Sequence, residues 1–430
     1  MGTIRLAYST FGLTNLDFLA AIDAVGAAGY EGIEIAFHRR QFNPFDIDDD
    51  YLATVRERLA AARVQPVCVA TASHFFDPQR PHEPSLLALD LAGRKRRIDL
   101  VKRGIHTARR LAAPLVSFGS GFIRAEHVRN STIDPHELLV DSIRQCLHEI
   151  RNDKDITLLI EPEPGMLIET MDDGLALVRE IDSPHFRLHV DLCHAYCSEP
   201  DYVAALGRAA PLTRYLHISD ARPGYNLKIV SDADTLAFDL SFASTLVYFP
   251  RGADYLLVDA AQPLYFSDAP PSRQRQQRIG ALLARAGIRN AVAWVDYASL
   301  YLGSSALDDE IFTYLISVPD LSFDVLERAR PIIAYLRGVR NPPLVARMVA
   351  NTLTGVAHFH EIPGEGSLDF ASSFKALTDR GFCGYGAVEL YHHVASWQKA
   401  LADSYRHLAP LARDARRTGG GWLPTDESRR

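Results

Sequence analysis

The feature that most constrains this chain is a short apolar segment that ends abruptly in carboxylates, residues 156–164 (ITLLIEPEP). A continuous aliphatic and β-branched run of this length is typical of a buried parallel strand. Three later segments share the pattern, and each ends in side chains that can bind a metal ion or move a proton. They are residues 186–196 (FRLHVDLCHAY), 213–221 (TRYLHISDA) and 384–393 (GYGAVELYHH). Four such strands in one chain predict one shared site.

The carboxyl ends of these four strands carry a mixed set of polar groups. In a closed parallel barrel all strands point the same way, so their carboxyl ends meet on the face where active sites are built. Glu161, Asp191, His217 and Glu389 can therefore converge on one divalent cation. Such ligands suit Mn²⁺, Co²⁺, Zn²⁺ or Mg²⁺ and argue against a thiolate site. Any one of these residues alone is better explained as an ordinary polar residue at a strand end, but the four together favour a metal site.

The composition is that of an ordinary soluble globular protein, with 47% hydrophobic and 23% charged residues. The net charge of −7 weighs against nucleic acid as the main partner, because phosphate binding needs clustered Lys and Arg. The five cysteines are scattered, without the paired spacing of a zinc knuckle, and are predicted to be reduced. No signal-peptide pattern or membrane-spanning run is present. We expect a cytoplasmic protein that binds neither membrane nor nucleic acid.

Strand and helix patterns alternate from the N-terminus onward, which is typical of parallel α/β architecture. The dense basic face of residues 94–111 is interpreted as the solvated side of an outer helix. The segment at 384–393 then supplies the eighth strand that a barrel needs to close. The seven earlier strands are expected at residues 4–10, 30–37, 66–73, 114–121, 156–164, 186–196 and 213–221.

The alternation breaks after Gly224, and about 130 residues intervene before it resumes near His358, far beyond the two to six residues of an ordinary barrel loop. This stretch contains apolar runs and a helix-like segment at residues 323–337, so we predict a folded insertion. Because it leaves and rejoins the barrel on the catalytic face, a lid or an oligomerisation element is expected. The predicted fold is an α/β (β/α)8 TIM barrel with a large insertion between strands 7 and 8. Its parts are residues 1–222 (strands 1 to 7), 223–356 (insertion), 357–415 (closing part) and 416–430 (disordered tail).

Seven motifs together resemble the sugar phosphate isomerase/epimerase superfamily. These xylose isomerase-like TIM barrels also include tagatose-type 3-epimerases, inosose dehydratase and endonuclease IV. The motifs cover residues 1–222 and about 358–411, and the insertion departs from the family's usual plan. They are STFG, GYEGIEI, LLIEPEPG, HVDLCH, YLHISDA, HEIPGEGSLDF and GFCGYGAVEL.

The resemblance implies that Glu161, Asp191, His217 and Glu389 bind one divalent metal ion and that Glu161 and Glu389 are an acid/base pair. In related isomerases and epimerases one glutamate removes a proton beside a carbonyl, and the other returns a proton to the enediolate. A C–H beside a carbonyl is too weak an acid for an unaided carboxylate, so both a Lewis acid and a positioned base are needed. The expected activity is a metal-dependent isomerase or epimerase acting on a sugar or cyclitol.

Five further residues are candidates for substrate binding. His194 matches a family position that contacts substrate. His360 precedes PGEG, where relatives place a polar ligand near the metal, although a role in holding the loop is an equal alternative. Glu34 and His74 lie near strand ends and can hold substrate hydroxyls, support the site from behind or face solvent. Arg222 is a candidate for binding a phosphate.

Three other functions stay open at the level of sequence. A lyase that dehydrates an inosose-like substrate or cleaves a C-glycoside would begin with the same proton abstraction. A metal phosphodiesterase resembling endonuclease IV would need a multinuclear site with more histidines and a basic groove. A non-catalytic scaffold would use the insertion for binding, and the insertion is also the candidate surface for a homo-oligomer.

Overall fold

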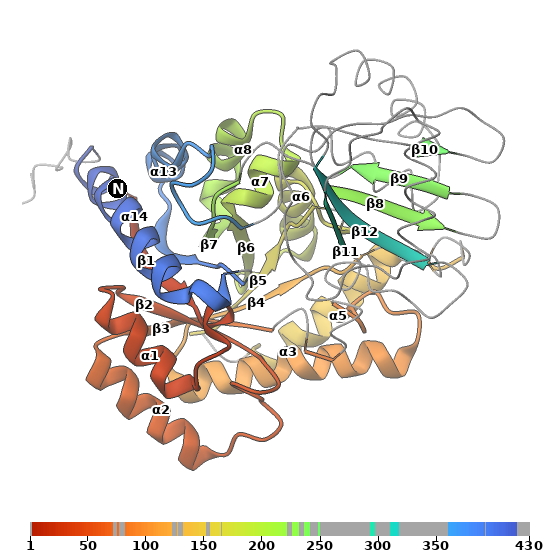
Figure 1. Ribbon diagram of the computed structural model, residues 1–430. Coiled ribbons are helices and arrows are strands. Elements are labelled where there is room, and N and C mark those ends of the chain that lie inside the picture. Colours follow the sequence, from red (N-terminus) through yellow and green to blue (C-terminus); the bar gives the residue numbers. More distant parts are fainter. Residues whose placement is uncertain are drawn as a thin grey trace, which may run out of the picture.

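Eight parallel strands close into a barrel in the spatial order β1-β13-β7-β6-β5-β4-β3-β2 (Figure 1). The computed structural model describes residues 2–71, 75–76, 82–122, 127, 132–151, 155–164, 166–221, 360–391 and 393–418, together with five further strands between residues 226 and 317. The barrel strands are β1 (Thr3–Ser9), β2 (Gly32–Ala36), β3 (Gln65–Ala70), β4 (Leu115–Gly119), β5 (Thr157–Glu161), β6 (Phe186–Asp191), β7 (Thr213–Ile218) and β13 (Cys383–Val388).

The strand β13 is the eighth barrel strand that the sequence predicted. It pairs in parallel with β1, from Thr3 opposite Cys383 to Tyr8 opposite Val388, and with β7 on its other side. The beginning and the end of the barrel sequence are thus neighbours in space. The predicted TIM barrel, interrupted between its seventh and eighth strands, is confirmed.

Helices cover the outside of the barrel, and most begin at an Asp or Thr whose side chain accepts a backbone N–H of the first turn. The outer basic helix begins at Leu91 and not at Arg94, because Asp90 caps it. The helices are α1 (Phe18–Ala27), α2 (Asp49–Ala62), α3 (Leu91–Leu111), α5 (Pro135–Glu149), α6 (Met171–Ile181), α7 (Leu192–Ser198), α8 (Tyr202–Ala209), α13 (Phe370–Asp379) and α14 (Trp397–Thr418), with short 3-10 turns at Thr10–Leu13, Ala210–Leu212 and Val394–Ser396.

A second, separate sheet lies in the sequence between β7 and β13. It is antiparallel, in the order β10-β9-β8-β12-β11. The helix predicted at residues 323–337 and the tail from residue 419 lie outside the described residues, and the role of the insertion stays a prediction. The strands are β8 (Asn226–Ser231), β9 (Leu236–Leu240), β10 (Tyr248–Phe249), β11 (Ala293–Asp296) and β12 (Glu310–Ser317).

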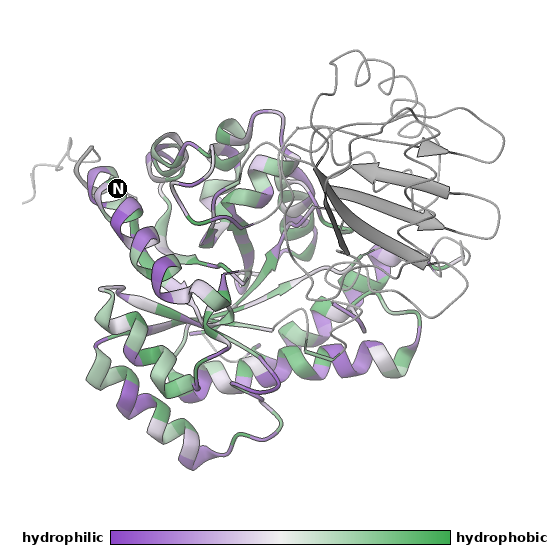
Figure 2. Ribbon diagram, in the orientation of Figure 1, coloured by the Kyte–Doolittle hydropathy of each residue, from purple (hydrophilic) through white to green (hydrophobic). Residues whose placement is uncertain are grey.

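The hydrophobic core has two layers. A large outer layer fills the space between strands and helices, and Figure 2 shows hydrophilic and hydrophobic bands alternating along the outer helices such as α3. A small inner layer fills the barrel with Ala7, Val67, Leu159, Tyr215 and Ala387. The inner layer is apolar in the middle of the barrel, so the polar groups gather at its carboxyl end. Among the described helices, none is long and apolar enough to cross a membrane.

The loop after β7 is tied to the segment that returns from the insertion. Asp220 and Glu361 form a two-way backbone bridge, with N···O distances of 2.8 and 2.9 Å. The Asp220 carboxylate also accepts the backbone N–H groups of Gly364, Gly366 and Leu368 at 2.8 to 3.0 Å. This anchor holds the returning segment against the carboxyl end of the barrel strands.

Candidate active site

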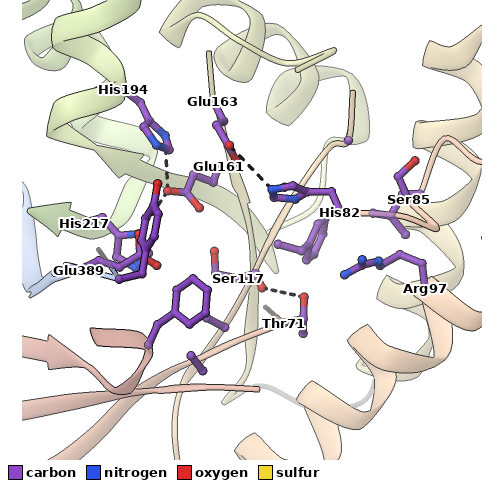
Figure 3. A pocket seen from close by; sticks show the side chains of 18 of the residues that line it. Thr71, His82, Ser85, Arg97, Ser117, Glu161, Glu163, His194, His217 and Glu389 are labelled. Carbon is purple, nitrogen blue, oxygen red and sulfur yellow. Dashed lines mark hydrogen bonds and ion pairs between the residues drawn. The ribbon is translucent and has the colours of Figure 1, made fainter. Parts of the chain in front are cut away.

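A cavity opens at the carboxyl ends of the barrel strands (Figure 3). One side of it is lined by carboxylates and imidazoles that are buried or nearly so. They come from β5, from β7, from α7, from the end of β13 and from the segment before α13. The members of this cluster that line the cavity are Glu161, His194, His217, His360 and Glu389.

His217, on β7, is the centre of the cluster. Its Nδ1 atom lies 3.2 Å from Glu161 Oε1, 3.5 Å from Glu389 Oε2 and 3.9 Å from Asp191 Oδ2. Its Nε2 atom lies 2.9 Å from Glu34 Oε2, on the opposite side of the ring. One imidazole nitrogen therefore faces three carboxylates while a fourth carboxylate holds the other nitrogen.

Asp191 is the last residue of β6 and caps the helix that follows. Its Oδ1 atom accepts the backbone N–H of His194 at 2.9 Å, and this bond starts α7. The sequence analysis treated residues 186–196 as one segment, whereas the strand stops at Asp191 because this cap turns the chain into a helix. Oδ2 remains directed at His217, His194 and His360, at 3.8 to 4.0 Å.

His360 enters the site from the segment that returns from the insertion and not from a barrel strand. Its φ of 48° places it in the left-handed region, which is uncommon for a residue other than glycine. Nδ1 lies 3.1 Å from the backbone carbonyl of Glu389 and 3.3 Å from its Oε2 atom, and Nε2 lies 3.3 Å from His194 Nε2. His360 therefore holds Glu389 in place and joins the cluster directly.

Glu161 is supported from inside the barrel by a pair that the sequence analysis missed. His189 Nδ1 lies 3.4 Å from Glu161 Oε2 and 2.7 Å from Ser117 Oγ, and its ring is fully buried. The signal was present, because His189 and Asp191 are two apart on β6 and alternate residues of a strand face the same side. His189 thus lies directly beneath the cluster.

The electrostatics of the cluster differ between its two glutamates. Burial raises the pKa of Glu161, and the nearby histidines offset only part of this effect. Burial also acts to raise the pKa of Glu389, but His217 and His360 outweigh it and the pKa is lowered. For His360, burial opposes protonation, yet Asp191 and Glu389 raise its pKa to about 10. The surrounding carboxylates thus favour positive charge in the centre of the site.

The donor set fits a divalent cation. Among the described residues, buried Glu161 Oε1, Asp191 Oδ2 and His217 Nδ1 form no hydrogen bond of good geometry, although His217 Nδ1 lies 3.2 Å from Glu161 Oε1. Such atoms are costly to bury unless something binds them. The Glu34 contact at Nε2 is the arrangement that commonly orients a metal-binding histidine. Several groups of ligand atoms in this cluster lie within 4.8 Å of one another, including the set Glu161, Asp191 and His194.

The structure brings the four predicted metal ligands together, with His194 and His360 beside them. Glu34 is buried behind His217 and does not line the cavity, which matches the supporting role that the sequence left open. His74 and Arg222 lie outside the described residues, so their roles stay predictions. The cavity is also lined by Phe11, His82, Ser85, Arg97, Glu163 and Tyr391, which the sequence analysis did not select.

Comparison with known proteins agrees with this geometry. Residues 22–232 match the family model described as the xylose isomerase-like TIM barrel. The barrel of this chain is a xylose isomerase-like TIM barrel. The resemblance seen in the sequence motifs is therefore confirmed. None of the curated proteins matches the chain.

Solved structures share the fold of this xylose isomerase-like protein at low sequence identity. A D-tagatose 3-epimerase-like protein is 12% identical with a TM-score of 0.55, and the match covers 97% of this chain and 100% of that chain. A xylose isomerase domain protein from Planctomyces limnophilus is also 12% identical with a TM-score of 0.51, covering 97% and 98% of the two chains. At these identities the likeness is one of fold.

Proposed function

We propose that this protein is a divalent-metal-dependent isomerase or epimerase that acts on a sugar or cyclitol by moving a proton next to a carbonyl. The observation that carries the proposal is the position of His217 Nδ1, which faces Glu161, Asp191 and Glu389 within 4 Å at the end of the barrel. The solved D-tagatose 3-epimerase-like protein has the same fold, and its name refers to a sugar epimerase.

Under this proposal Glu161, Asp191, His217 and Glu389 hold the metal ion. The bound cation would act as a Lewis acid that polarises the substrate carbonyl and lowers the pKa of the neighbouring C–H. Glu34 keeps His217 in the tautomer that leaves Nδ1 for the metal. The candidate ions are Mn²⁺, Co²⁺, Zn²⁺ and Mg²⁺, because carboxylate and imidazole ligands suit all of them.

Glu161 and Glu389 are the proposed acid/base pair. They come from β5 and from the end of β13, which are separated by β6 and β7 in the barrel, so they approach the centre from two sides. Burial raises the pKa of Glu161, whereas His217 and His360 lower that of Glu389. A bound cation would favour the carboxylate form of both, so each could accept a proton from the substrate and return it.

The test is metal content by elemental analysis on protein purified without chelator, for wild type and Glu389→Gln. About one equivalent of Mn, Co, Zn or Mg, reduced in the variant, is the expected result. Solvent deuterium exchange into ketoses and inososes would then show the proton transfer. Loss of water or of an aglycone from the substrate would indicate a lyase. Absence of metal in both proteins, with none taken up on addition, would refute the proposal.

One observation favours a second candidate, metal-assisted phosphodiester hydrolysis. His194 Nε2 and His360 Nε2 lie 3.3 Å apart, and Asp191 Oδ2 lies within 4.0 Å of both, so these three residues can hold a further cation. Hydrolysis of this kind uses more than one metal ion. Two or three zinc ions per chain, with cleavage of bis(p-nitrophenyl) phosphate, would favour this function over proton transfer.

A further inference from the structure

The cavity has a second polar wall that the proton-transfer chemistry does not use. Figure 3 shows Arg97 and Ser85 on the side away from His217 and Glu389, with the imidazole of His82 between the two sides. All of these residues line the same cavity. Charged side chains are expensive to bury, so their presence along a cavity points to a polar ligand.

Glu163 extends this wall from the loop after β5. It is only 5% exposed, it lines the cavity, and its Oε1 atom lies 3.8 Å from His82 Nε2. Its backbone is fixed, since its N–H donates to Ile168 O at 3.1 Å and its carbonyl accepts the N–H of Met166 at 3.0 Å. Glu161 and Glu163 therefore both point into the cavity from one short segment.

His82 is held opposite Glu163 by its own surroundings. Its ring packs edge to face on Phe122, with centroids 5.4 Å apart, and its φ of 65° is uncommon outside glycine. Backbone strain of this kind gathers at functional sites.

Arg97 and Ser85 complete the wall with hydrogen-bond donors. Arg97 comes from α3, and its Nε donates to Pro84 O at 2.7 Å, which fixes the direction of the guanidinium. Ser85 Oγ accepts the N–H of Leu87 at 3.2 Å, so its hydroxyl hydrogen is directed elsewhere. The wall thus offers the carboxyl oxygens of Glu163, guanidinium and hydroxyl donors, and an imidazole that can donate or accept a hydrogen bond.

We propose that Glu163, His82, Ser85 and Arg97 form a subsite for neutral hydroxyl groups at the end of the substrate that does not react. An ionised phosphate offers only hydrogen-bond acceptors and an ammonium group only donors, so neither matches both sides of the wall. A hydroxyl group both donates and accepts, so it satisfies both sides of the wall. The inference rests on the proposed function and narrows its substrate class to unphosphorylated polyhydroxylated ketones long enough to reach from the metal-ligand cluster to Arg97.

The test compares ketones that share the reacting group and differ at the far end. Dihydroxyacetone carries the α-hydroxyketone without distal hydroxyls, D-fructose adds them, and D-fructose 6-phosphate adds a charge. Solvent deuterium incorporation on the metal-loaded enzyme gives kcat/KM for each. We expect D-fructose to exceed dihydroxyacetone by about 100-fold and to exceed its phosphate, because a site built to bind hydroxyls discriminates strongly against their absence.

The substitutions Glu163→Gln and His82→Asn are expected to lower the fructose-to-dihydroxyacetone ratio about tenfold or more. His136 and Glu180 form an exposed pair on α5 and α6, 2.7 Å apart, so His136→Asn and Glu180→Gln are matched controls that should leave the ratio unchanged. An unaltered ratio in the two cavity variants would overturn the proposal. A preference for the phosphate that disappears in Arg97→Gln would overturn it in favour of an anion site.

Binding measured without turnover separates this inference from the proposed reaction. Saturation-transfer NMR on D-fructose reports which substrate protons contact the protein. If no ketone takes up solvent deuterium, the proposed proton transfer is refuted. The subsite is then supported only if the signals of the C4 to C6 protons are present in wild type and lost in Glu163→Gln. Equal signals in the two proteins, or none in wild type, would refute it.

Discussion

Glu34 Oε2 lies 2.9 Å from His217 Nε2, although the two residues come from β2 and β7, which are separated in the barrel by β1 and β13. The contact therefore crosses the inside of the barrel. By taking Nε2 it leaves Nδ1 facing the carboxylates of Glu161, Asp191 and Glu389. It fixes both the orientation and the tautomer of the proposed metal ligand.

Replacing Glu34 by Gln should weaken metal binding about 10- to 100-fold, because the amide no longer supports His217 as a charged acceptor does. Competition with a fluorescent chelator measures the affinity. Glu57→Gln, an exposed change on α2, is the control. The supporting role is wrong if both variants bind the metal as tightly as wild type does while remaining folded.

Asp220→Asn should lower the free energy of unfolding by about 3 kcal/mol. The carboxylate accepts N–H groups from Ala221 and Leu368 on one oxygen and from Gly364 and Gly366 on the other. An amide would turn its own NH₂ toward one pair of donors, and hydrogen bonds to charged groups are worth roughly 1.5–3 kcal/mol each. Urea unfolding gives the difference.

The matched control for Asp220 is Asp201→Asn. Asp201 caps α8 through the N–H of Ala204 at 3.0 Å, and Asn caps a helix about as well as Asp does, so almost no loss of stability is expected. Similar effects of the two substitutions would mean that the Asp220 anchor contributes little.

Stability should fall as the pH rises above about 10, in part through Tyr8. Burial raises the pKa of this phenol in the folded protein, so above the unfolded value of about 10 the unfolded state releases the proton first. The contribution of Tyr8 to the free energy of unfolding is therefore complete below pH 10. It decreases as the pH rises from 10 toward the pKa of Tyr8 in the folded protein. Tyr8→Phe should unfold with a shallower pH dependence between pH 9 and 11 in urea titrations.

The same variant should not be less stable than wild type at pH 8. The Tyr8 hydroxyl is buried without a hydrogen-bond partner among the described residues, and removing such a group costs little or stabilises the protein. A large loss of stability at pH 8 would show that the hydroxyl has a partner that matters.

One cysteine of five should react rapidly with a thiol reagent in the native protein. Cys383 is exposed, whereas Cys68, Cys146, Cys193 and Cys197 are buried, and burial raises the pKa of the Cys146 thiol to about 12. Titration with Ellman's reagent should give one fast equivalent, lost in Cys383→Ser, and five equivalents in guanidinium chloride. More than one fast thiol would contradict the buried placement of the others.

Local sequence pattern was enough to locate the strands and the residues at their ends. Asp191, His217 and Glu389 follow apolar runs whose period decides which side chains face the barrel interior, so their convergence could be predicted once parallel closure was assumed. The same alternation would have revealed His189, two residues before Asp191. The insertion was visible as an interruption of the strand and helix rhythm before β13.

Other parts of the site depend on contacts between distant segments. Glu34 and His217 are 183 positions apart, and His194 and His360 are 166 apart, so no local pattern joins them. The wall made by Glu163, His82 and Arg97 combines a loop after β5 with a loop and a helix after β3. Periodicity decides which face a residue takes, but the partner of a buried charge is decided only when closure of the barrel brings the strand ends within hydrogen-bonding distance.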